Sequence, residues 1–108
     1  MLKEKLSLAR TYYMPIFPFK ISVGTDMPLD GADGTTTHHG NEIIINFKHR
    51  LPNAQTIAHE CAHAVYAIEE EIKDEFSEET FCYVLDHLVY HVKEMVKEMR
   101  AERNGGKK

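Results

Sequence analysis

The chain has 108 residues, 43% of them hydrophobic, which is enough for one domain with a single modest core. Its net charge of −4 at neutral pH argues against nucleic acid as a partner, because phosphate binding needs a basic surface. The charged start lacks the apolar core of a secretion signal, and no apolar run reaches the length of a membrane span. We therefore expect a cytoplasmic protein with no membrane contact.

The N-terminal part of the chain predicts one helix and one strand. Apolar residues recur at helical spacing over residues 2–12, and two prolines, Pro15 and Pro18, end that helix. Residues 17–23 then alternate apolar and polar side chains, as a half-buried strand does. A loop rich in Gly and Asp follows over residues 28–34.

A hairpin is predicted next, formed by residues 35–39 and 42–48. Gly40-Asn41 joins its two strands, and a glycine at the first turn position suits a type II′ turn. Three consecutive isoleucines at residues 43–45 indicate that the second strand is buried on both of its faces.

The C-terminal half predicts two helices, over residues 53–70 and 77–103. A proline-asparagine pair supplies the start signal of the first helix, and Ser77 caps the second. Residues 104–108 are typical of a helix stop and a flexible tail. Together the elements predict a single α+β domain over residues 1–103, with a small, mostly antiparallel sheet packed against the two helices.

The first of these helices carries the motif His59-Glu60-Cys61-Ala62-His63. Side chains four residues apart lie on the same helix face, so His59 and His63 can bind one metal ion. Glu60 then points at the open side of that ion, where a general base is needed. This H-E-x-x-H pattern is the signature of zinc peptidases. The apolar stripe of the helix excludes both histidines and consists of Ile57, Cys61, Ala64, Val65 and Ile68.

A catalytic zinc site needs a third protein ligand, and the first turn of the second helix offers Glu78 and Glu79. The helix dipole also favours acidic residues in a first turn, which accounts for both without a metal. Glu78 lies nearer the apolar stripe, whereas Glu79 shares a polar-aromatic face with Tyr83 and Tyr90. The residue pattern leaves both candidates open. Tyr83 is also our candidate for stabilising a developing oxyanion, with His87 as the alternative.

Three stretches of the chain together resemble the compact ImmA/IrrE-type zinc peptidases. Those proteins show a strand of the form x-I-x-I-N, then T-[LI]-A-H-E-x-x-H-[AV], then a helix with E-A-x-x-[FY]-A. The chain has E-I-I-I-N at 42–46, T-I-A-H-E-C-A-H-A-V at 56–65 and E-T-F-C-Y-V at 79–84. Residues 77–84 are closer still to S-E-E-A-Y-A-Y-L, a variant found in small phage-encoded proteins of this kind.

The resemblance implies a minimal zincin-like fold with Zn²⁺ bound by His59, His63 and Glu79. It implies a peptidase that hydrolyses a polypeptide substrate with Glu60 as general base, acting in the host cytoplasm if the protein is phage-encoded. The alternative is a non-catalytic module that binds a protein partner and has a structural metal or none. The small size favours the alternative, whereas Glu60 favours catalysis, because a structural metal site does not need it.

Two further groups of residues, a second histidine pair and the two cysteines, are not assigned to the metal site. His87 and His91 form a second pair at helical spacing, but no carboxylate is placed beside them as in the H-E-x-x-H motif. Cys61 and Cys82 are expected to be reduced, buried, small apolar side chains.

Overall fold

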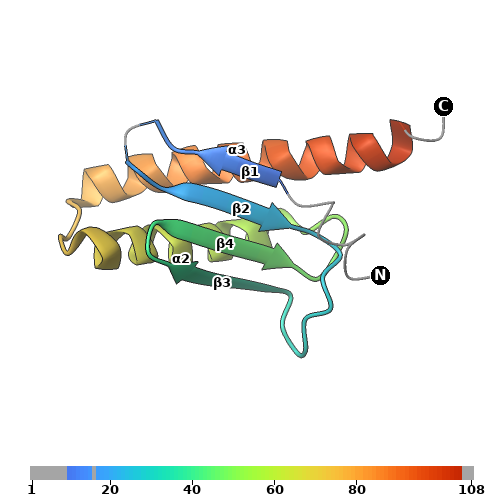
Figure 1. Ribbon diagram of the computed structural model, residues 1–108, viewed down its shortest axis with the longest axis horizontal. Helices are drawn as coiled ribbons and strands as arrows, with labels where there is room; N and C mark the ends of the chain where they lie inside the picture. The colour runs from blue at the N-terminus through green and yellow to red at the C-terminus, as the bar shows by residue number, and fades with distance from the viewer. Residues whose placement is uncertain (1–9, 16, 106–108) are drawn as a thin grey trace.

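The computed structural model describes residues 10–15 and 17–105, and this part of the chain forms four strands and two helices (Figure 1). Their bounds are β1 (Arg10–Tyr13), β2 (Lys20–Gly24), β3 (Gly34–His39), β4 (Glu42–Phe47), α2 (Ala54–Ile72) and α3 (Glu78–Gly105). The strands form one layer and the two helices lie behind it in a second layer (Figure 1). The domain is therefore α+β, as expected.

The four strands form one mixed sheet in the order β1-β2-β4-β3. β2 and β4 run parallel, whereas β1 pairs with β2 and β3 pairs with β4 in the antiparallel sense. α2 packs against β3 and β4, and α3 packs against α2, β1 and β2. The turn between β3 and β4 has a φ of 60° at Gly40 and no positive φ at Asn41, as a type II′ turn requires.

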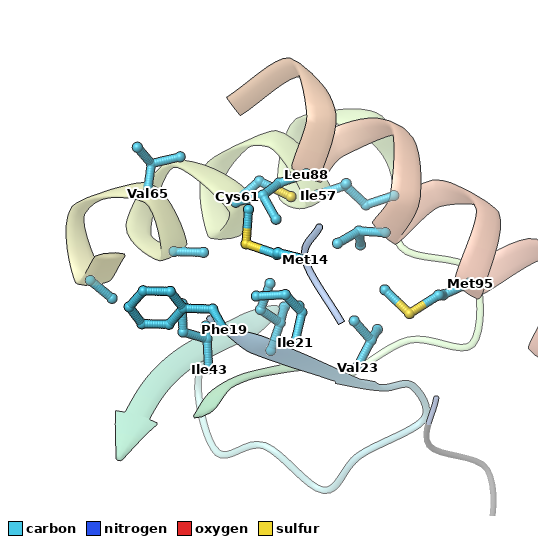
Figure 2. Packing of buried hydrophobic residues seen from close by; sticks show 14 of the residues in the cluster. Met14, Phe19, Ile21, Val23, Ile43, Ile57, Cys61, Val65, Leu88 and Met95 are labelled. Atoms are coloured by element: carbon cyan, nitrogen blue, oxygen red, sulfur yellow. The ribbon is translucent and has the colours of Figure 1, made fainter. Parts of the chain in front are cut away.

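One face of the sheet is covered by the helices and carries the core (Figure 2). Ile21, Val23 and Ile43 point from the sheet toward the helices and are fully buried. The predicted apolar stripe of α2 is buried along its whole length. Ile44 is only half-buried, so the prediction that residues 43–45 are covered on both faces is wrong. The two helices lie on the same side of the sheet, which leaves the Ile44 face without a covering layer among the described residues.

The predicted helix over residues 2–12 is wrong where the structure describes it. Residues 10–12 belong to β1, and residues 2–9 lie outside the described residues. β1 pairs with β2, and two side chains bind it to α3. The Tyr12 hydroxyl lies 2.7 Å from Nε2 of His87, and Arg10 forms an ion pair of 2.7 Å with Glu102. A short segment such as this one is not stable as a helix through its own residue pattern alone, so the long-range contacts with β2 and α3 determine its conformation.

Both long helices begin at the capping residues that the sequence predicts. Asn53 Oδ1 accepts a hydrogen bond of 2.8 Å from the Thr56 N–H, and Ser77 Oγ accepts one of 3.2 Å from the Thr80 N–H. Each bond satisfies one of the backbone donors that a helix leaves unpaired in its first turn.

The helices end later than predicted. α2 ends where Lys73 adopts a left-handed conformation with a φ of 58°, which lets its N–H bond to the carbonyl of Glu69. α3 continues through Gly105, so residues 104 and 105 are helical rather than part of a tail, and 106–108 lie outside the described residues. Neither helix, where described, combines the length and the apolar content needed to cross a membrane.

Candidate metal and active site

The two histidines of the motif lie on the exposed face of α2, opposite the side that packs in the core. Their Nε2 atoms are 3.2 Å apart, and their rings meet edge to face at 75°. Two nitrogens bound to one tetrahedral zinc ion at about 2.0–2.1 Å lie about 3.4 Å apart. The spacing of His59 and His63 therefore fits two ligands of a single ion, with one ring donating to the other when no metal is bound.

Glu60 points to another side of the helix, toward β3, and is only 5% exposed. Thr36 Oγ1 lies 2.7 Å from Oε1 of Glu60 and 3.1 Å from its main-chain carbonyl oxygen, so its hydroxyl donates to one end of the carboxylate. The other oxygen, Oε2, accepts no hydrogen bond from the part of the chain that the structure describes. The arrangement leaves one carboxylate oxygen to receive a proton from a bound molecule.

Gly34 is what lets Glu60 approach β3 so closely. A Cβ atom at this position would lie 2.9 Å from Cγ and 3.1 Å from Oε2 of Glu60. Any larger side chain would have to displace the carboxylate. Neither Gly34 nor Thr36 is recognisable from the sequence, because both are 24 residues or more from Glu60 in the chain and only the fold brings them together.

A groove of about 390 Å³ runs between the start of β3 and the first turns of α2. Its lining consists of Ala32, Asp33, Gly34, Asn53, Gln55, Thr56, His59 and Glu60. Both the first histidine and the glutamate of the motif therefore face the same groove. β3 pairs only with β4 among the described strands, so its other edge is available beside this groove.

The structure does not bring a third ligand to the histidine pair. Among the described residues, no three His, Cys, Asp or Glu side chains are grouped so that they could hold a metal ion. Glu79 is exposed in the first turn of α3, and Glu78 lines a different groove. The choice of Glu79 over Glu78 stays a prediction.

The position of the first turn of α3 follows from the connection between the helices. The Phe76 N–H donates a hydrogen bond of 2.8 Å to Glu69 Oε2, and the rings of Tyr66 and Phe81 lie 5.1 Å apart. The first turn of α3 therefore lies beside the last turns of α2, and Glu69 is six residues beyond His63. At 1.5 Å per residue this is about 9 Å along the helix axis.

Tyr83 and His87 face a different cavity, of about 230 Å³, between α3 and the connection from β1 to β2. Tyr83 is 68% exposed. His87 shares a hydrogen bond with the Tyr12 hydroxyl. The Tyr12 ring also stacks on the ring of His91, with ring centroids 4.1 Å apart and an interplanar angle of 16°. Burial, reinforced by the neighbouring His91, lowers the pKa of His87, and burial raises the pKa of Tyr12. His87 and His91 thus bind β1 to α3, and Tyr83 lies on their side of the helix.

The two cysteines differ in environment. Cys61 is buried, and burial together with the neighbouring Glu60 raises the pKa of its thiol to about 12. Cys82 is exposed, so the prediction that both cysteines are buried is wrong for this one. Both are free thiols.

Comparison with known proteins gives no match: no protein-family model, no curated protein and no solved structure corresponds to this chain. The assignment of a function therefore depends on the residues of the site and their geometry.

Proposed function

We propose that the protein is a zinc-dependent peptidase with a minimal zincin-like domain. The observation that carries this proposal is the 3.2 Å spacing between the Nε2 atoms of His59 and His63, which matches two ligands of one tetrahedral ion. The buried carboxylate of Glu60 beside them, in a groove along a sheet edge, supports it.

Each residue of the site has a chemical task in this proposal. His59 and His63 would hold the ion through their Nε2 atoms. When bound, zinc would supply Lewis acidity toward water and toward a peptide carbonyl. Glu60 accepts the proton of the attacking water and later delivers it to the leaving amine. Oε2 is the oxygen suited to this transfer, because Thr36 engages Oε1.

The remaining roles come from the sequence. We propose Glu79 as the third ligand, with Glu78 as the alternative. Tyr83 stays the sequence-based prediction for the oxyanion donor, and it faces the cavity beside the connection from β1 to β2 rather than the groove of His59 and Glu60. The substrate is a polypeptide: an extended segment placed along the edge of β3 would form main-chain hydrogen bonds there and present a peptide bond to the groove.

Metal content tests the proposal directly. Protein purified without a histidine tag should contain about one zinc ion per chain, because a mononuclear site holds one ion. His63→Ala should lose the metal, whereas His39→Ala, an exposed histidine of β3, should keep it. Absence of metal from folded wild-type protein supplied with zinc would refute the proposal.

Two further comparisons assign the carboxylates. Glu60→Gln should retain zinc and lose cleavage of a peptide library read by mass spectrometry; unchanged cleavage would exclude Glu60 as the base. Glu79→Gln should weaken zinc binding by about tenfold or more, with Glu78→Gln as the matched control on the adjacent residue. If Glu78→Gln weakens zinc binding more than Glu79→Gln does, Glu78 is the third ligand instead.

A non-catalytic, protein-binding module is the second candidate. Two observations favour it: the described His, Cys, Asp and Glu side chains offer no complete metal site, and three tyrosines of the helices, Tyr66, Tyr83 and Tyr90, are largely exposed. Zinc-loaded wild-type protein that cleaves no member of a broad peptide library would support this candidate over the peptidase.

A further inference from the structure

The end of the molecule where α2 meets α3 is strongly acidic. Residues 69–79 contain seven acidic residues and one lysine, a net charge of −6, whereas the whole chain has −4. The rest of the protein is therefore slightly basic. This segment comprises the last turn of α2, the connection and the first turn of α3, at one end of the helical layer (Figure 1).

Within the part of the chain that the structure describes, most of these carboxylates have no cationic partner. His38 lies 3.4 Å from a carboxylate oxygen of Glu70 and 3.9 Å from one of Glu71. Among the described residues, Glu75 and Glu78 form no ion pair, and both are exposed. Unpaired charges of one sign repel each other and attract cations from solution.

A groove of about 340 Å³ lies in the middle of this acidic end. Its lining consists of Tyr66, Glu69, Glu75, Phe76, Glu78, Phe81 and Cys82. Tyr66 is 60% exposed, and its ring lies 5.1 Å from that of Phe81. Exposed aromatic surface bordered by carboxylates attracts a cation that also carries apolar groups.

We propose that this groove binds arginine or lysine side chains of a basic polypeptide segment. The aliphatic stem of such a side chain would lie on the rings of Tyr66 and Phe81, and its charged end would meet Glu75 and Glu78. A single divalent cation is a poorer occupant, because no three described carboxylates converge as metal ligands do. Carboxylates that lie apart from one another can each pair with a different basic side chain of the same polypeptide segment. This site goes beyond the proposed peptidase and needs neither zinc nor cleavage.

The natural cysteines provide a probe for this site. Cys82 lines the groove and is exposed, whereas Cys61 is buried and serves as an internal reference. The ligand is an amidated peptide of four arginines alternating with glycine, and its control has the four arginines replaced by the neutral isostere citrulline. When about nine-tenths of the protein is bound, the arginine peptide should slow alkylation of Cys82 by N-ethylmaleimide about tenfold, and the citrulline peptide at the same concentration should not. Equal rates with both peptides would overturn the proposal.

Variants then locate the site by calorimetry. Glu75→Gln with Glu78→Gln should weaken binding of the arginine peptide about fivefold at about 0.1 M ionic strength, where charges more than about 10 Å apart are largely screened. Asp30→Asn with Glu94→Gln removes the same two charges away from the groove and should leave binding within about twofold. Equal weakening by both pairs would show a diffuse charge effect and overturn the specific groove.

The aromatic part of the proposal needs a separate variant. Tyr66→Leu keeps an apolar side chain but removes the π-system, and should weaken binding about threefold. Unchanged binding would remove Tyr66 from the site. Protection of Cys82 by calcium chloride but not by the arginine peptide would assign the groove to a metal ion and overturn the proposal.

Discussion

Replacement of Thr36 by valine isolates the hydrogen bond that holds Glu60 against the sheet. Threonine and valine have nearly the same shape, so the change removes the hydroxyl and leaves little cavity. The bond is 2.7 Å long, its acceptor is a carboxylate, and Glu60 is 5% exposed. Hydrogen bonds to charged groups contribute about 1.5–3 kcal/mol, so we expect the free energy of unfolding to fall by about 2 kcal/mol. For a chain of this length, the midpoint of thermal unfolding should fall by roughly 9 °C.

The matched control is Thr37→Val on the same strand. Thr37 is exposed and points to the opposite face of the sheet, away from Glu60. Because both substitutions replace threonine by valine in the same strand, any change in strand propensity is common to both. Thr36→Ser keeps the hydroxyl and should recover most of the lost stability. Chemical denaturation of the three variants gives the comparison. Equal stability of Thr36→Val and Thr37→Val would refute the reasoning.

The environments of Gly34, Cys61 and His87 can each be tested by substitution or labelling. Gly34→Ala should lower the free energy of unfolding by about 1–3 kcal/mol, because its Cβ would lie 2.9 Å from Cγ of Glu60; the loss should shrink in a Glu60→Ala background, and an equal loss there would contradict the contact. In folded protein, alkylation followed by mass spectrometry should modify Cys82 alone, because burial raises the pKa of the Cys61 thiol to about 12; modification of both would contradict its burial. Burial lowers the pKa of His87, so the unfolded state binds this proton more readily. The free energy of unfolding should therefore fall as the pH drops below about 6.5 and through the folded pKa, and the fall should be smaller in His87→Gln. Denaturation at about pH 7.5 and about pH 5 measures this difference, and equal falls in the two proteins would remove His87 as its source.

The parts of the fold that local chemistry determines were predictable from the sequence. Asn53 and Ser77 cap their helices as predicted, since a cap acts within four residues. Gly40 forms the predicted hairpin turn for the same reason. β1 was not predictable, because Tyr12 and its neighbours become a strand through partners far along the chain. The half-exposed face of Ile44 was missed because its exposure depends on both helices lying on the same side of the sheet.

In the candidate site, too, local features were predictable from the sequence, whereas features that depend on distant segments were not. The convergence of His59 and His63 is a property of one helix, so their spacing in the sequence was sufficient to predict it. The environment of Glu60 depends on Gly34 and Thr36, which belong to an edge strand placed beside α2 only by the fold. No periodicity within α2 could have identified them.

Whether the first turn of α3 supplies the third ligand depends on two free energies, that of zinc binding and that of the contacts that hold this turn. The first turn of α3 is held beside the end of α2 by the hydrogen bond from the Phe76 N–H to Glu69 and by the contact of the Phe81 ring with Tyr66, and the Ser77 cap fixes the turn itself. A helix cap contributes about 1 kcal/mol, and an ordinary hydrogen bond contributes a similar amount. Binding of zinc to a complete protein site releases about 10–16 kcal/mol in small zinc domains. Divided among four ligands, this is about 2.5–4 kcal/mol for one carboxylate, which is similar to what the local contacts contribute, so the zinc affinity of Glu79→Gln decides whether this turn supplies the third ligand.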